Sequence, residues 1–410
     1  MLDIKFIKEN LKIVEEGARN KGVNVSIQNL LKLDEEQKAL NVNVQRLREE
    51  RNIAAKARDV EKGKKIKEEL DKKEKRLTEL NEDIKKIIIQ LPNPPKKDVK
   101  VGKNDKENEV LRKEGSPKKF NFIPEDHLTI GEKLGIIDVE RASKISGSRF
   151  YYLKGDGVLL EFALKQLAFE TLIKEGFVPV LPPVLVKEEV MRGLGYMEDG
   201  GDEDMYIFEK DGLVLVGTSE QSIVPMHKNE VLNLDELPKR YVGFSSCFRR
   251  EAGSYGKDTR GILRAHQFDK IEMVSFVKQG EDDKEHEFLL SLEEKLLQSL
   301  EIPYQVVKMC TGDLGFPAAR KYDLEAWIPS EEKYREVTST STTTDFQARR
   351  LNIKYRENNK TEYANILNGT AFSTRPIVAI LENNQQEDGS VLIPKVLQKY
   401  LNKTVIKPQK

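Results

Sequence analysis

Two runs of residues with heptad spacing constrain the fold of this chain most strongly. In the first run the seam positions follow at alternating intervals of four and three residues: Leu33, Gln37, Leu40, Val44, Leu47, Arg51 and Ala54. In the second run the seam positions are Ile66, Leu70, Lys73, Leu77, Leu80, Ile84, Ile87 and Leu91. This spacing is typical of helices that pair as a coiled coil.

Gly63 lies in the charged stretch between the two runs, and glycine there indicates a turn. Folding the chain back at Gly63 would pair Leu47 with Leu77 across the seam. The sequence therefore predicts an antiparallel two-helix coiled-coil hairpin over about residues 30–92, with prolines after Leu91 ending the second helix. A helix of about 25 residues is on the order of 40 Å long.

The predicted hairpin is locally basic, although the whole chain balances 69 acids against 69 bases. Residues 46–76 hold thirteen Lys and Arg and eight Asp and Glu, and the Gly63 register sets Arg51 against Lys73 within the seam. Like charges there destabilise the pair unless they point outward or meet an anion. This basic surface has two possible interpretations. It is either an ordinary solvated helix surface or an arm that contacts a phosphate backbone. The candidate contacts are Arg46, Arg51, Arg58, Lys65 and Lys73.

The pattern changes from about residue 120 onward. Short β-branched runs alternate with longer helical patterns such as 158–175 and 280–299. This predicts an α+β domain with a largely antiparallel sheet. The sequence lacks the Rossmann Gly-x-Gly-x-x-Gly and the Walker Gly-x-x-x-x-Gly-Lys patterns, which argues against those nucleotide-binding folds. We expect two domains, a helical arm over 1–105 and a larger body over 106–410.

Cysteine content and hydropathy indicate a cytoplasmic protein. The two cysteines, Cys247 and Cys310, lie far apart in sequence and form no Cys-x-x-Cys pair. They predict neither a zinc cluster nor a disulfide framework. No run of eighteen apolar residues occurs, and the first residues contain no apolar signal segment. We therefore expect no membrane partner.

Residues 247–273, CFRREAGSYGKDTRGILRAHQFDKIEM, place charged residues among apolar ones. The pattern is typical of a hairpin, with Gly253 and Gly256 at the two ends of its tip. Charges set between Phe248, Phe268 and Met273 are costly to bury unless a ligand pairs with them. Arginine suits phosphate and carboxylate, whereas carboxylates suit ammonium, hydroxyl and metal. A solvated, charged hairpin is the simpler alternative that composition allows.

Four segments, in order along the chain, resemble the seryl-tRNA synthetase family. They are the motif 2-like 247–273, then CTGDLGFPAARKYDLEAW at 310–327, EVTSTSTTTDFQARR at 336–350, and the motif 3-like ILNGTAFSTRPIVAILEN at 366–383. The similarity extends more weakly to residue 1. It implies a class II synthetase catalytic domain, an antiparallel sheet flanked by helices, with an N-terminal coiled-coil arm. Leu167–Val186 resembles motif 1, which implies a homodimer through about 160–186.

The resemblance also implies an activity, that of an ATP-dependent serine–tRNA ligase. Such an enzyme joins L-serine to ATP as seryl-adenylate, releases pyrophosphate, and transfers serine to tRNA(Ser). The family also implies tRNA(Sec) as a partner. In this family the arm grips the long variable arm of the tRNA by its shape and backbone. The activation step needs positioning and charge stabilisation rather than an acid–base residue, in agreement with only four histidines.

The resemblance assigns nucleotide-binding roles residue by residue. Arg249 would bridge the α-phosphate and the serine carboxylate, because a guanidinium suits both anions. Glu251 would accept a hydrogen bond from the adenine amino group. Phe268 and Arg375 would stack on the two faces of the adenine ring. Glu336 and Ser339 would hold Mg²⁺ through oxygen atoms. The implied ATP-binding set is Arg249, Arg250, Glu251, Phe268, Glu336, Val337, Thr338, Ser339 and Arg375, with Arg249, Glu336 and Arg375 catalytic.

Recognition of serine requires polar selection, because a site that hydrogen-bonds a hydroxyl rejects analogues without one. Glu272 and Thr370 match the family positions that contact the serine hydroxyl. Thr218 and Glu220 match those around the ammonium group, and Arg249 meets the carboxylate. The chain departs from the usual family pattern at 340–344 and 371–374, where threonines and Ala371 occur.

Two other functions fit parts of this pattern. A synthetase-like ligase could load an amino acid onto a carrier protein, but such homologues lack the long arm. An inactive paralogue could act as an RNA-binding or regulatory protein. That reading predicts erosion of Arg249, Glu251, Glu336 or Arg375, and all four residues are present.

Overall fold

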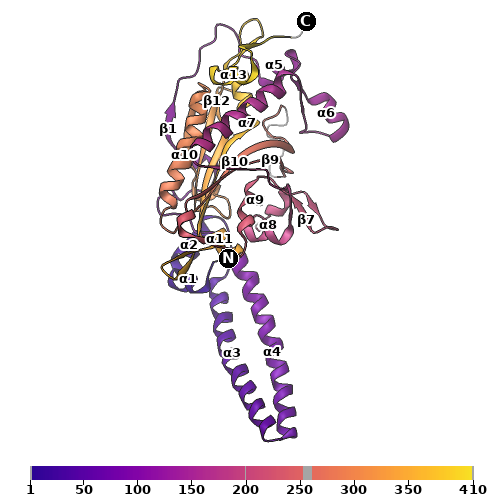
Figure 1. The fold of residues 1–410 in the computed structure, drawn as a ribbon, viewed down its shortest axis with the longest axis vertical. Helices are drawn as coiled ribbons and strands as arrows, with labels where there is room; N and C mark the ends of the chain where they lie inside the picture. The colour runs from indigo at the N-terminus through magenta and orange to yellow at the C-terminus, as the bar shows by residue number, and fades with distance from the viewer. Residues whose placement is uncertain (1, 199, 253–260, 409–410) are drawn as a thin grey trace. The chain divides into compact units, whose positions relative to one another are not determined.

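The computed structural model describes residues 2–198, 200–252 and 261–408, and their contacts form two compact units, Met1–Pro94 and Pro95–Lys410 (Figure 1). The sequence placed the domain boundary at 105/106. The connector instead bonds into the second unit: Lys96 donates its backbone N–H to Ala319 at 2.9 Å, and Gly102 donates to Thr311 Oγ1 at 3.2 Å. The hairpin tip expected at 253–256 lies outside the described residues.

The first unit is helical, as predicted. Its helices are α1 (Ile4–Glu9), α2 (Leu11–Asn20), α3 (Ile27–Lys56) and α4 (Val60–Ile89). Figure 1 shows α3 and α4 as two long antiparallel helices. Two ion pairs join them, Arg48 to Glu74 at 2.7 Å and Arg76 to Glu36 at 2.9 Å.

The hairpin turns at residues 57–59, so the prediction of a turn at Gly63 was wrong. Arg58 adopts a left-handed φ of 55°, and the Asp59 carboxylate accepts from the backbone N–H of Lys62 at 3.0 Å. A side-chain N-cap contributes about 1 kcal/mol to a helix start. One glycine inside a helix costs about as much, so Gly63 is tolerated within α4.

The earlier turn also changes the register of the seam. Gln37 bonds to Asn81, and the buried Leu47 clusters with Leu70 rather than with Leu77. Arg51 is exposed, and Lys73 pairs with a glutamate of its own helix. The predicted opposition of Arg51 and Lys73 therefore does not arise.

The second unit is built on an eight-stranded sheet. From one edge to the other its strands are β1 (Glu109–Glu114), β11 (Tyr304–Lys308), β12 (Arg320–Ile328), β13 (Lys333–Thr344), β16 (Asn365–Ser373), β10 (Gln267–Val277), β9 (Lys239–Phe248) and β4 (Val178–Val180). Only the β4–β9 pair is parallel. The sheet confirms the predicted α+β class with antiparallel pairing.

The second unit also contains nine α-helices within its described residues. They are α5 (His127–Lys133), α6 (Val139–Ser146), α7 (Asp156–Lys174), α8 (Glu188–Leu194), α9 (Glu220–Ile223), α10 (Asp282–Ser299), α11 (Phe346–Leu351), α12 (Arg375–Asn383) and α13 (Lys395–Leu401). Helices α7 and α10 both contact β16, and their apolar faces enter the largest core cluster. No helix in the described ranges has the length and apolar character to cross a bilayer.

Short strands complete the unit. They form the pairs β2 (Ile137–Asp138) with β3 (Tyr152–Leu153) and β17 (Val391–Leu392) with β18 (Val405–Ile406), and the triples β15 (Lys360–Tyr363), β14 (Lys354–Glu357), β8 (Val231–Asn233) and β5 (Leu185–Lys187), β7 (Leu213–Leu215), β6 (Ile207–Phe208). After α7 the extended chain forms two short strands, β4 and β5, that are separated by four residues. Pro182 and Pro183 lie there, and proline cannot donate to a strand ladder.

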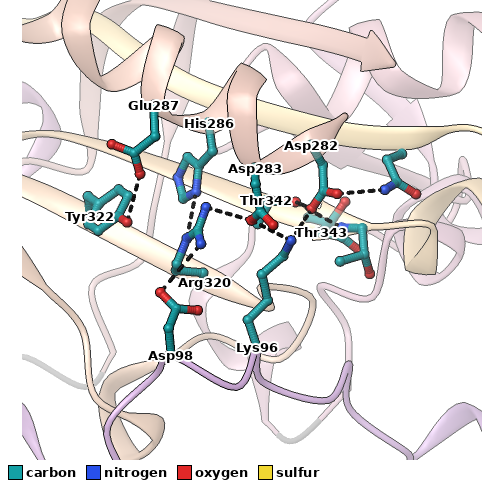
Figure 2. A network of polar contacts seen from close by, with 12 residues as sticks. Lys96, Asp98, Asp282, Asp283, His286, Glu287, Arg320, Tyr322, Thr342 and Thr343 are labelled. Atoms are coloured by element: carbon teal, nitrogen blue, oxygen red, sulfur yellow. Dashed lines mark hydrogen bonds and ion pairs between the residues drawn. The ribbon is translucent and has the colours of Figure 1, made fainter. Parts of the chain in front are cut away.

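A polar network that is buried at Asp282, His286 and Arg320 ties the connector to α10 and β12 (Figure 2). Lys96 Nζ lies 2.6 Å from carboxylate oxygens of both Asp282 and Asp283. The Arg320 guanidinium bonds to Asp283 at 2.9 Å and to His286 Nδ1 at 3.2 Å. Burial and the nearby arginine lower the pKa of His286 to about 3, so a neutral ring accepts this bond. The first turn of α10 is thereby fixed relative to the sheet.

The seam register is testable by cross-linking. With Gln37→Cys and Asn81→Cys together, a short bifunctional thiol reagent should link α3 to α4 within the hairpin. The matched pair Leu40→Cys and Ile84→Cys, which the Gly63 turn would bring together, should not link. After a protease has cut the hairpin between the two helices, a cross-linked protein keeps its full-length mobility on a denaturing gel. Linking of the 40/84 pair without linking of the 37/81 pair would reject the register described here.

Candidate active site

A cavity of about 460 Å³ opens on one face of the central strands. Its lining includes most of the residues that the sequence predicted for the site: Thr218, Glu220, Arg249, Phe268, Glu272, Glu336, Val337, Thr338, Ser339, Thr370 and Arg375. Side chains two apart in a strand share a face, which explains why Phe268 and Glu272 of β10 reach the same cavity. Arg249, Glu272, Glu336 and Arg375 thus line one cleft.

Two residues of the predicted nucleotide set lie beside this cavity rather than in its lining. The Arg250 side chain is exposed and lies over the Tyr206 ring, 5.9 Å from its centre. Glu251 lines a smaller cavity that shares Phe268 and Arg375 with the main one. The Glu251 carboxylate pairs with Arg264 at 3.2 Å.

Glu336 and Arg375 form an ion pair across the cleft, with Nη1 2.9 Å from Oε2. Arg375 also donates to the backbone carbonyls of Leu263 at 3.2 Å and Glu336 at 3.3 Å. Burial raises the pKa of Glu336, but the attraction of Arg375, followed by Lys321 and Arg249, outweighs burial and lowers the pKa to about 2. Glu336 is therefore a carboxylate at neutral pH.

Glu272 occupies a polar niche between β10 and β16. It is 2 % exposed, and its Oε2 lies 2.8 Å from Lys270 Nζ. Thr370 stands opposite Glu272 in the strand register and donates its hydroxyl to the same oxygen at 3.1 Å. The carboxylate is thus held by two groups, which suits recognition of a small polar ligand.

Glu220 is a second buried carboxylate of the cleft, at the start of α9. It accepts from the Tyr196 hydroxyl at 2.8 Å and from Gln347 Nε2 at 2.9 Å. Burial raises the pKa of Glu220, and repulsion from Glu272 adds to this effect. A cationic ligand group would relieve that repulsion, so the two acids complement an ammonium ion.

Arg249 follows the end of β9, where its side chain turns into the cleft. Its Nε donates to the carbonyl of Gly217 at 3.3 Å, and its guanidinium lies 5.4 Å from the centre of the Phe268 ring. His266 bonds through Nδ1 to the Arg249 carbonyl at 2.9 Å. His266 therefore holds backbone in place, as expected for a structural histidine rather than a general base.

Three further residues that were not predicted from the sequence also line the cleft: Lys270, Lys321 and Tyr196. Lys270 could have been found, because it lies two residues before Glu272 in a strand and so shares its face. Tyr196 follows α8 in a loop that has no periodicity to reveal it. Lys321 pairs with Asp323 at 3.1 Å, and this attraction overcomes burial and raises the pKa of Lys321.

The predicted metal ligands, Glu336 and Ser339, line the same cavity. An ionised carboxylate and a hydroxyl are the oxygen donors that Mg²⁺ accepts. The described residues contain no cluster of three or more His, Cys, Asp or Glu arranged to hold a metal ion. This donor set therefore fits a cation that arrives with phosphate and water ligands of its own.

Comparisons with known proteins agree over the whole chain. Family models match for the tRNA synthetase class II core domain (G, H, P, S and T) over residues 206–384 and for the seryl-tRNA synthetase N-terminal domain over residues 1–95. The chain is 44 % identical to the serine–tRNA ligase of Thermobifida fusca, with 100 % of this chain and 99 % of that protein aligned. It is 43 % identical to that of Dictyoglomus thermophilum, with both chains fully aligned.

Two solved structures are also similar. Seryl-tRNA synthetase from Pyrococcus horikoshii, complexed with ATP, superimposes with a TM-score of 0.94 at 40 % identity, and both chains are fully covered. The cytoplasmic serine–tRNA ligase of Naegleria fowleri, in complex with AMP, superimposes with a TM-score of 0.91 at 32 % identity. That match covers 100 % of this chain and 99 % of the other.

The lowered pKa of Glu336 predicts how stability depends on pH. An acid whose pKa is about 2 when folded and about 4.3 when unfolded stabilises the fold above the unfolded value and loses that contribution as pH falls. The stability advantage of the wild type over Glu336→Gln should therefore be constant above about pH 5 and shrink below it. Urea unfolding at a series of pH values measures this difference.

Glu325→Gln is the control, because the pKa of Glu325 is shifted in the opposite direction to that of Glu336. Burial raises the pKa of Glu325, so its contribution is present at low pH and is lost as pH rises. Relative to wild type, this variant should gain stability as pH increases. The same trend in both variants would contradict the assigned ionisation of Glu336.

Proposed function

The chain belongs to the seryl-tRNA synthetase family, and from this membership we propose how its cleft and its helical arm work. The protein is an ATP-dependent serine–tRNA ligase. It forms seryl-adenylate and pyrophosphate from L-serine and ATP, then transfers serine to tRNA. The observation that carries the proposal is the meeting of Arg249, Glu272, Glu336 and Arg375 in one cleft of a chain that matches its relatives from end to end.

Arg249 is the residue that brings the two substrates together in this proposal. A serine carboxylate oxygen attacks the α-phosphorus, and the bond from that phosphorus to the bridging oxygen of pyrophosphate breaks. The Arg249 guanidinium can bond to the carboxylate and the α-phosphate at once, holding them in line. It also stabilises the charge that develops on the phosphate oxygens. No proton has to move in this step.

The adenine ring lies between Phe268 and Arg375 in this account. Both residues border the main cavity and the smaller one, where Glu251 also lies. Glu251 accepts a hydrogen bond from the adenine amino group in place of the one it now accepts from Arg264. Arg250 is exposed, so we place it at the outer rim of the nucleotide site.

Along β13, Glu336 and Ser339 hold Mg²⁺, with Val337 and Thr338 forming the wall between them. When bound, the ion neutralises phosphate charge. The ionised Glu336 carboxylate attracts it, and Arg375 balances that carboxylate in its absence. The Glu336–Arg375 pair therefore keeps the cleft from containing an unpaired buried charge.

Serine is selected by the opposite end of the cleft. Glu272 and Thr370 bond to the hydroxyl, while Glu220 and Thr218 surround the ammonium group. Alanine leaves the Glu272 niche with an unsatisfied polar group, which costs free energy. The raised pKa of Glu220 supports this assignment, because an ammonium ion would stabilise its ionised form.

The partner of the arm is tRNA(Ser). Arg51, Arg58 and Lys65 are exposed on or beside α3 and α4, and Arg46 and Lys73 pair with Glu50 and Glu69 of their own helices. Such pairs are weak and can be exchanged for phosphate. Recognition by shape and backbone does not read an anticodon, so tRNA(Sec) with a similar long arm is a second partner.

A second copy of the chain covers α7 and β4 in this proposal. Large apolar side chains on these elements and just after them are exposed: Leu159, Phe162, Ile173, Val178 and Leu181. Leu181 is 79 % exposed, and β4 is an edge strand. An apolar surface beside a free strand edge favours association. This supports a homodimer through about residues 160–186, working in the cytoplasm where tRNA is charged.

The two alternatives explain less. A ligase acting on a carrier protein has no use for the arm, yet residues 1–95 match the N-terminal domain of seryl-tRNA synthetases. An inactive paralogue has no need to keep its nucleotide-binding residues together, yet Arg249, Glu336 and Arg375 line one cavity and Glu251 lines the smaller cavity beside it.

Replacing Glu272 tests the serine site. Glu272→Ala should lower serine-dependent ATP–pyrophosphate exchange at least about 100-fold, because a hydrogen bond to a charged group is worth up to about 3 kcal/mol. ATP binding, measured by calorimetry, should be nearly unchanged. Glu325→Gln on β12 is a matched control that should retain exchange. Normal exchange in Glu272→Ala would remove this residue from the site.

Shortening the arm tests its role. Residues 42–75 can be replaced by a short Gly-Ser turn, which retains the Glu36–Arg76 and Gln37–Asn81 contacts near the base. Serine-dependent exchange should remain within about twofold of wild type, whereas charging of tRNA(Ser) should fall at least about 100-fold because the phosphate contacts are gone. Equal loss of both activities would mean that the arm is structural.

A further inference from the structure

Helix α10 packs against β13 and β16. In β13, Ser339 and Ser341 line the cleft and alternate with Thr338 and Thr342, and Thr338 also borders the cavity. Both threonines donate to acids of α10. Thr342 bonds to Asp282 at 3.1 Å, as Figure 2 shows, and Thr338 bonds to Glu293 at 2.9 Å.

Asp282 belongs to the connector network, whereas Glu293 lies in the core. Glu293 has no exposed surface, and its Oε1 has no hydrogen-bond partner in the described part of the chain. Burial raises the pKa of Glu293 well above its usual value, although the bond from Thr338 opposes this. Glu293 is therefore a neutral carboxyl group in the core. Its unpaired oxygen costs free energy that an apolar side chain in the same place would not.

The unpartnered oxygen of Glu293 faces the backbone of β16. Oε1 lies 2.9 Å from the place that a Cβ atom on Gly369 would occupy, so only glycine permits this approach. Gly369 stands opposite Thr340 of β13 and Met273 of β10. Glu293 thus touches two adjacent central strands, one through Thr338 and the other through Gly369.

Both contacts lie directly behind the serine end of the cleft. Gly369 is flanked by Asn368 and Thr370, which line the cavity, and Thr370 donates to Glu272 at 3.1 Å. A displacement of the β16 backbone at Gly369 moves the Thr370 hydroxyl relative to Glu272.

We propose that Glu293 is a positioning residue that sets the size of the serine pocket by holding β16 at Gly369 and β13 at Thr338. The inference rests on the proposed serine site. Truncating Glu293 leaves a cavity behind Gly369, and the surrounding structure relaxes partly into such space. The strand then moves away from the cleft, so the pocket loosens around serine and gains room for the additional methyl group of threonine.

The test compares Glu293→Ala with Glu293→Gln in ATP–pyrophosphate exchange. Glu293→Ala should raise the KM for serine about tenfold, leave the KM for ATP within about twofold, and lower the preference for serine over threonine about tenfold, as one methyl group allows. Glu293→Gln, which keeps the shape and the neutral state, should restore all three values to within about twofold of wild type.

Leu300→Ala is the matched control for lost packing, because Leu300 is buried two turns further along the same helical face. It should lower the melting temperature without changing the serine-to-threonine preference. Equal shifts in Leu300→Ala and Glu293→Ala would overturn the proposal. So would a Glu293→Ala enzyme with wild-type KM for serine and wild-type preference.

A double-mutant cycle keeps the proposal falsifiable if Glu293→Ala folds poorly. Gly369→Ala places a methyl group against Glu293 and should raise the KM for serine, and adding Glu293→Ala should partly restore it. Additive effects would contradict a direct contact between these positions.

If wild-type enzyme gave no exchange with serine, the proposed function itself would fail. Serine-dependent wild-type exchange with an unaffected Glu293→Ala variant would reject this inference alone.

Discussion

The pairing of opposite charges within the cleft is the constraint on which the rest of the site depends. Lys270 and Glu272 form a buried pair within β10, and Glu336 of β13 pairs with the partly exposed Arg375 at the start of α12, so none of the four charges is left alone. An isolated buried charge costs several kcal/mol, so these pairs make a stable empty cleft possible. The same ion pairs suit the cleft to bind serine and ATP. The ammonium, carboxylate and phosphate groups of these substrates can replace one partner of each pair.

Strand register positions the polar residues around these pairs. Glu272 stands opposite Thr370, and Thr340 stands opposite Gly369, so β10, β16 and β13 present their functional atoms in fixed rows. The opposite face of the same strands contacts α10. A side chain on that helix, such as Glu293, can therefore act on the cleft without reaching it.

The sequence was most informative where local periodicity decides structure. Alternation in 267–273 and the family-like order of segments correctly placed Arg249, Glu272, Glu336 and Arg375 in one cleft. The heptads predicted the hairpin but not its register, because the N-cap at Asp59, rather than Gly63, sets the start of α4. Tyr196 and Glu293 could not be predicted, since a loop residue has no period and a buried acid in a helix looks like a solvated one. Their roles follow from contacts between segments distant in the chain.

The central claim is that this cleft activates serine with ATP. Its most direct test is ATP–pyrophosphate exchange by the intact protein, with serine, threonine, alanine and cysteine assayed in parallel. The account predicts strong exchange with serine, and at most weak exchange with alanine because the Glu272 niche would be left unsatisfied. Exchange supported by a different amino acid, with none for serine, would contradict it.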